Sequence, residues 1–165
     1  MRAYLHTPDA ADPVRDLGEL DPATRLAEVV ELQLGEQLWV EDGDDPVDSS
    51  MPLAELTGGD GASRGNGTTP AVVHLQRHRR NRITVVVSYN GRTVTDDYSP
   101  ATTIAKVQRR AVRALNVAAA EAADLVLQQR GATESLDEDE HLGTLVGPDG
   151  EKLELDLVPA HRFAG

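Results

Sequence analysis

The chain has 165 residues, a net charge of −12 and no cysteine. This length suits one ordinary domain or two small ones. The absence of cysteine excludes disulfides, zinc–thiolate sites, iron–sulfur clusters and thiol catalysis. The negative charge disfavours general binding to nucleic acid or anionic membranes. No apolar run approaches the roughly 18 residues of a membrane helix, and no signal segment is recognisable at the start, so we expect a cytoplasmic protein.

Charge is distributed unevenly along the chain. Residues 1–70 contain four arginines, no lysine and fifteen acidic residues, whereas residues 71–165 contain twelve basic and thirteen acidic residues. This division suggests two units with different surfaces. Only two of the basic residues are lysines, Lys106 and Lys152. GC-rich codon usage would explain the preference for arginine, and so would avoidance of self-attachment.

The first half predicts strands at residues 2–6, 37–41 and 71–76, and a further strand with the weakest pattern at residues 14–17. Asp21 and Pro22 suit the N-cap and first turn of a helix whose apolar face contains Leu26, Val29 and Val30. An acidic loop, an LxxLxG segment at residues 53–58 and a glycine-rich stretch separate the last two strands.

The second half has clearer patterns. Two β-branched runs at residues 82–89 and 92–98 flank Asn90-Gly91, the strongest short hairpin signal. Apolar residues at three- and four-residue steps then predict a helix over residues 103–115. A third strand follows at residues 124–128, and a turn at residues 148–150 precedes a last strand at residues 152–158.

The two halves share this order and an LxxLxG segment, which recurs at residues 142–147. Two strands in a hairpin, a helix, a strand, a short turn and a last strand resemble the β-grasp fold of ubiquitin-like proteins. The stretch ADLVLQQRGATESLDEDEHLGTL carries most of the resemblance. We therefore expect an α+β fold with two tandem ubiquitin-like β-grasp domains at residues 1–76 and 83–158, an arginine-rich linker at residues 77–82 and a flexible C-terminal tail at residues 159–165.

The tail is the main functional signal. Pro159 ends the alternation of the last strand, and the sequence PAHRFAG finishes in small residues. An extended seven-residue tail spans about 23 Å and can place its carboxylate in a distant enzyme site. The whole chain resembles bacterial two-domain ubiquitin-like modifiers of phage-defence conjugation systems. This resemblance implies conjugation through Gly165, with tail recognition through Ala164, Phe163, Arg162 and His161.

The same resemblance implies partners but no catalysis by this chain. The expected partners are an adenylating activating enzyme, a conjugating enzyme, a metal-dependent deconjugating protease and an amine of a target protein. We expect no catalytic residue, cofactor or bound metal in this chain, and no nucleic-acid or membrane partner. Alternation along the strands indicates a partner-binding surface that contains Val126, Val158 and Trp39, all predicted to face outward; for Trp39, packing against the other domain or its own core is the alternative.

Other charged segments predict no site. The acidic runs at residues 41–45 and 137–140 lack the calcium-loop pattern and are expected to be solvated. The arginine cluster at residues 77–82 is expected to pair with the acidic first domain or to be solvated. Two alternatives to the modifier remain open, namely a non-conjugated β-grasp scaffold and a sulfur carrier whose C-terminus becomes a thiocarboxylate.

Overall fold

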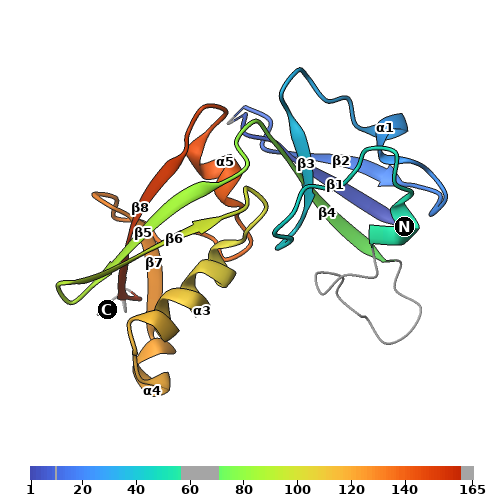
Figure 1. Cartoon of the computed structure of the whole chain (residues 1–165). Coiled ribbons are helices and arrows are strands. Elements are labelled where there is room, and N and C mark those ends of the chain that lie inside the picture. Colours follow the sequence, from blue (N-terminus) through green and yellow to red (C-terminus); the bar gives the residue numbers. More distant parts are fainter. Residues whose placement is uncertain (10, 57–70, 161–165) are drawn as a thin grey trace.

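A computed structural model describes residues 1–9, 11–56 and 71–160 of the chain. The described residues form two four-stranded mixed sheets, with strand orders β2-β1-β4-β3 and β6-β5-β8-β7 (Figure 1). The first sheet contains β1 (Arg2–His6), β2 (Val14–Glu19), β3 (Gln37–Val40) and β4 (Val72–His78). The second contains β5 (Ile83–Tyr89), β6 (Arg92–Tyr98), β7 (Leu125–Gln129) and β8 (Lys152–Pro159).

Both sheets have the same connectivity. In each, the first and last strands of the domain run parallel at the centre, β1 with β4 and β5 with β8. The remaining strands pair antiparallel on either side of these two. This is the β-grasp arrangement, so the predicted fold, α+β with two tandem β-grasp domains, is confirmed.

The C-terminal domain has the larger apolar core. Helix α3 (Ile104–Ala114) packs Ile104, Val107 and Ala111 against the inner face of the sheet. Inward residues of β5 and β8 alternate with more exposed ones, because successive side chains of a strand point to opposite faces. At the hairpin between β5 and β6, Asn90 and Gly91 adopt φ of 46° and 75°, as the Asn-Gly signal predicts.

The N-terminal domain has a smaller core with little helix. Helix α1 (Leu26–Val29) is a single turn, although the apolar pattern predicted a longer helix that starts at Asp21. Asp21 instead forms a tight turn, in which its side chain accepts a hydrogen bond from the N–H of Ala23 and its carbonyl accepts from Thr24. The weakly predicted second strand is present as β2. The core residues are Leu5, Leu26, Val30, Leu38, Leu53, Leu56, Val73 and Leu75.

Three short helices complete the described structure, α2 (Leu53–Leu56), α4 (Ala119–Ala122) and α5 (Leu142–Val146). Helix α5 contacts β4 of the other domain and lies between the two sheets (Figure 1). Strand β4 continues to His78, so the first two residues of the predicted linker at residues 77–82 belong to a strand. Only four residues then connect β4 to β5, which keeps the domains close together.

Candidate functional site

The last described strand carries the chain toward the predicted conjugation tail. Strand β8 pairs with β7 as far as Pro159, which lies opposite Leu125, and the N–H of Ala160 donates to the carbonyl of Asp124 at 2.7 Å. Ala160, the last described residue, therefore lies beside the start of β7. The residues predicted for conjugation and tail recognition, His161, Arg162, Phe163, Ala164 and Gly165, lie outside the described residues.

Val126 and Val158 lie directly opposite each other on β7 and β8, and both are partly exposed. They alternate with core leucines, so they occupy the outer face of the sheet as predicted. Their role in binding a partner stays a prediction.

Charged side chains flank this valine pair. The guanidinium of Arg130 lies 3.2 Å from the Glu154 carboxylate and 3.6 Å from that of Asp156. It also donates to the hydroxyl of Ser88 at 2.6 Å. The outer face therefore presents a small apolar pair next to an acidic area that one arginine partly neutralises.

Part of the outer face of the N-terminal sheet is covered, and the prediction that Trp39 is an exposed partner-binding residue is wrong, whereas its alternative, a packed Trp39, agrees with the structure. Trp39 has no exposed surface and lies opposite Gln76 of β4. Gln76 is also fully buried, and its side-chain oxygen lies 3.1 Å from Nδ1 of His141, a residue of the other domain. The C-terminal domain therefore occupies the sheet face on which Trp39 was expected to meet a partner.

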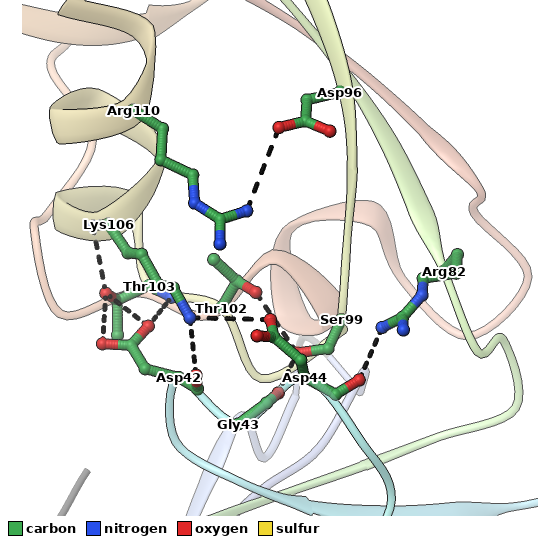
Figure 2. A network of polar contacts seen from close by, with 10 residues as sticks. All are labelled: Asp42, Gly43, Asp44, Arg82, Asp96, Ser99, Thr102, Thr103, Lys106 and Arg110. Carbon is green, nitrogen blue, oxygen red and sulfur yellow. Dashed lines mark hydrogen bonds and ion pairs between the residues drawn. The ribbon is translucent and has the colours of Figure 1, made fainter. Parts of the chain in front are cut away.

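A hydrogen-bonded loop fixes the same interface from its other side (Figure 2). Oδ1 of Asp42 accepts from the N–H of Thr103 at 2.8 Å and from its hydroxyl at 3.0 Å, at the start of α3. Nζ of Lys106 donates to the backbone carbonyl of Asp42 at 2.6 Å. The hydroxyl of Ser99 donates to the backbone carbonyl of Gly43. The acidic run at residues 41–45, predicted to be solvated, is therefore the docking loop of the N-terminal domain.

The arginine cluster at residues 77–82 pairs largely with the N-terminal domain, which was one of the two predictions for it. Arg77 lies 3.7 Å from the carboxylate of Glu36, and Arg82 donates to the carbonyl of Asp44 at 2.6 Å. Arg80 instead lies 3.3 Å from the carboxylate of Glu151, which belongs to the C-terminal domain.

Three histidines and a glutamate meet at the centre of the interface. Nε2 of His6 lies 2.9 Å from Nδ1 of His74, and the ring of His6 stacks on that of His141 with centroids 3.8 Å apart. On the other side of the His141 ring, Nε2 lies 3.0 Å from a carboxylate oxygen of Glu41. We call His6, His74, His141 and Glu41 the histidine cluster.

The histidine cluster has the residue types of a metal site but a different geometry. Ligand atoms of His6, Glu41 and His141 lie within 4.8 Å of one another. An imidazole binds a metal along the lone pair in its own ring plane. The rings of His6 and His141 stack with an interplanar angle of 25°, so in this arrangement their lone pairs do not converge on one point. The observed contacts instead form a hydrogen-bonded network.

The tautomer of His141 is set by its neighbour. The side-chain nitrogen of Gln76 donates to the carbonyl of Arg77, which turns the amide oxygen toward His141. Nδ1 of His141 therefore carries a proton. Its Nε2 lies 3.0 Å from a carboxylate oxygen of Glu41. The contact between His141 and Glu41 therefore links the two domains across the interface.

Comparison with known proteins shows what the second domain is similar to. Residues 84–160 match the family described as BilA ubiquitin-like domain 2. Among solved structures, a ubiquitin of Caldiarchaeum subterraneum has 17% sequence identity and a TM-score of 0.36, covering 51% of this chain and 99% of that chain. No curated protein matches the sequence. The match of residues 84–160 confirms the predicted resemblance of the C-terminal domain to ubiquitin-like proteins. In the described ranges, no helix is long and apolar enough to span a bilayer.

Proposed function

We propose that this chain is a ubiquitin-like protein modifier that becomes attached to amines of target proteins through the carboxylate of Gly165. One observation supports this most directly. The ubiquitin-like match ends at Ala160, one residue after the end of β8, and the sequence HRFAG follows. A tail that follows a folded ubiquitin-like domain and finishes in the small residues Ala164 and Gly165 suits the enzymatic activation of a carboxylate.

The proposed chemistry proceeds in three steps on partner enzymes. A Gly165 carboxylate oxygen attacks the α-phosphate of ATP, pyrophosphate leaves, and an acyl-adenylate forms. A partner cysteine thiolate then displaces AMP to give a thioester. Finally, a neutral amine attacks the carbonyl carbon, the C–S bond breaks, and the amine proton passes to a base or to solvent as an amide forms. Glycine leaves the carbonyl unhindered at each step.

Recognition in this proposal is divided between the tail and the outer sheet face. His161, Arg162, Phe163 and Ala164 enter the channel of the activating enzyme. Val126 and Val158, partly exposed on the outer face of the C-terminal sheet, provide a docking surface. An activating enzyme, a conjugating enzyme and a metal-dependent deconjugating protease complete the proposed system, and the resemblance to two-domain modifiers of phage-defence systems supports a proposed role in bacterial antiphage defence.

Pyrophosphate exchange tests the first step. The chain is incubated with its candidate activating enzyme, ATP and radiolabelled pyrophosphate. We expect exchange with the wild type, none after deletion of Gly165, and a strong reduction for Gly165→Val, which crowds the carbonyl. Glu28→Gln, at an exposed position of the N-terminal domain, is the control and should retain exchange.

Two outcomes would overturn the proposal. Exchange that survives deletion of Gly165, or that never occurs with the wild type, would leave the non-conjugated scaffold as the better description. Adenylation followed by a thiocarboxylate on Gly165, detected by mass spectrometry without any amide-linked product, would identify a sulfur carrier.

A further inference from the structure

Four of the five histidines of the chain lie at the interface between the two domains. His6, His74 and His141 belong to the histidine cluster, and His78 reaches across to the carbonyl of Gly147 at 2.8 Å. The fifth, His161, lies outside the described residues. Protonation of the described histidines by mild acid therefore acts at this interface.

We propose that this interface is an acid-sensitive latch: mild acidification separates the two folded domains and exposes the outer face of the N-terminal sheet, including Trp39. The proposal concerns the relation between the domains and does not depend on conjugation through Gly165.

His6 is the first component of the latch. It is 8% exposed, and the groups that face it are His74 of β4, His141 of the other domain and Glu41 after β3. Burial, reinforced by the charges of His141 and His74, lowers the pKa of His6 to about 3, and Glu41 opposes this only weakly. His6 is therefore neutral in the closed form, and a proton on its ring would face two other imidazoles.

His78 is the second component. Its Nε2 donates to the carbonyl of Gly147, while its Nδ1 accepts from the N–H of Arg80 at 2.9 Å. The neutral ring thus satisfies both neighbours, and a second proton would break the bond to Arg80. Burial lowers the pKa of His78, Arg80 adds to this, and the two backbone hydrogen bonds and Glu36 oppose it.

Glu41 acts in the same direction at lower pH. Burial alone would raise the pKa of Glu41, but the hydrogen bond and charge of His141 outweigh it, so the pKa is lowered overall. A carboxylate with a lowered pKa stabilises the closed form above its usual pKa and loses this contribution as the pH falls. Protonation of Glu41 would remove its charged hydrogen bond to His141.

The sign of the effect follows from proton binding. In the open form His6 and His78 are exposed to water and titrate near the usual histidine value of about 6.5. In the closed form they stay neutral to lower pH, so the open form binds more protons. Below about pH 6, His6 raises the opening equilibrium constant by up to about tenfold per pH unit, and the lowered pKa of His78 favours opening in the same direction.

Domain separation can be measured directly because the chain has no cysteine and one tryptophan. Glu28→Cys and Glu134→Cys place one dye on an exposed position of each domain for energy transfer. Between pH 7 and pH 4.5 we expect energy transfer to fall and Trp39 emission to shift to longer wavelength, while far-UV circular dichroism stays constant. Constant energy transfer over this range would overturn the proposal, as would a fall that coincides with loss of circular dichroism.

A matched pair of variants identifies the histidines responsible. His6→Gln with His78→Gln removes both titrating rings but keeps polar side chains, so the transition should move to lower pH or disappear. His161→Gln removes the histidine of the tail and should leave the transition unchanged. An unchanged transition in the double variant would overturn the proposal.

If the two domains of the double variant do not associate even at neutral pH, NMR of the wild-type protein tests the proposal instead. The ring protons of His6 and His78 should show protonation only as energy transfer is lost. Titration of both rings near pH 6.5 with the domains still closed would refute the latch.

Discussion

The carboxylate of Asp42 accepts two hydrogen bonds from Thr103, at 2.8 and 3.0 Å, although the residues belong to different domains. Thr103 is the N-cap of α3, and its hydroxyl also accepts from the N–H of Lys106. The first N–H groups of a helix lack partners within the helix, and its N-terminus attracts negative charge. An acidic loop of one domain thus completes the cap of a helix in the other.

Asp42→Ala should therefore weaken the contact between the domains more than it weakens either core. Loss of the carboxylate leaves the N–H and hydroxyl of Thr103 without this partner, at a cost of about 1–3 kcal/mol. Asp42 adopts φ of 59°, a conformation that asparagine tolerates, so Asp42→Asn is the matched control for the backbone. We expect the alanine variant to open at lower urea concentration than the asparagine variant, as followed by energy transfer between the two domains. Equal opening of both variants would contradict a specific role for the side chain.

Gly143 is needed for the close approach of α5 to the N-terminal sheet. A Cβ atom at this position would lie 2.9 Å from the side-chain nitrogen of Gln76 and 2.9 Å from Cβ of Pro100. Gly143→Ala should therefore cost about 1–3 kcal/mol in the stability of the interface. Gln76→Ala removes one of the two obstructions, so the double variant should lose less than the sum of the single variants. Strict additivity in denaturant unfolding would show that the two positions do not meet.

The sequence predicted the fold better than it predicted the interface. Strand alternation, the Asn-Gly hairpin and the repeated LxxLxG segment depend on neighbours along the chain, and these determined both β-grasp domains. The contacts of Asp42 with Thr103 and of Glu41 with His141 join residues 61 and 100 positions apart, which no local pattern records. For this reason, the sequence predicted that the acidic run at residues 41–45 is solvated.

One signal of the covered face was nevertheless present in the sequence. The outward positions of β4 are Val72, His74, Gln76 and His78, which carry no formal charge when the histidines are neutral. The equivalent positions of β8 include Lys152, Glu154 and Asp156, as suits a face in water. A strand face without formal charge on a highly charged domain indicates burial, and it favours the alternative given for Trp39, packing against the other domain.

The valine pair of the C-terminal sheet should matter for partners and little for folding. Val126→Asp with Val158→Asp places two charges on a partly exposed surface, and we expect a change of less than about 1 kcal/mol in stability. Under the proposed function, thioester formation with the activating or conjugating enzyme should decrease strongly. Val72→Asp, at a valine that is 40% exposed on the other domain, is the control and should form the thioester as the wild type does. Thioester formation at the wild-type level by the double variant would remove this surface from the proposal.

The two lysines should differ sharply in reactivity. Lys152 is 59% exposed and lies 3.8 Å from Glu154, whereas Lys106 is 18% exposed and donates to the carbonyl of Asp42. Lys106 reacts only after this bond breaks, which costs about 1–3 kcal/mol and slows labelling roughly ten- to a hundredfold. Brief amine labelling followed by peptide mass spectrometry should therefore modify Lys152 first, and Asp42→Ala should accelerate labelling of Lys106 alone. If the chain is a modifier, the same difference makes Lys152 the lysine through which a second copy could be attached, because Lys106 is engaged in holding the domains together. Equal labelling of both lysines in the wild type would show that the docking loop is open in solution.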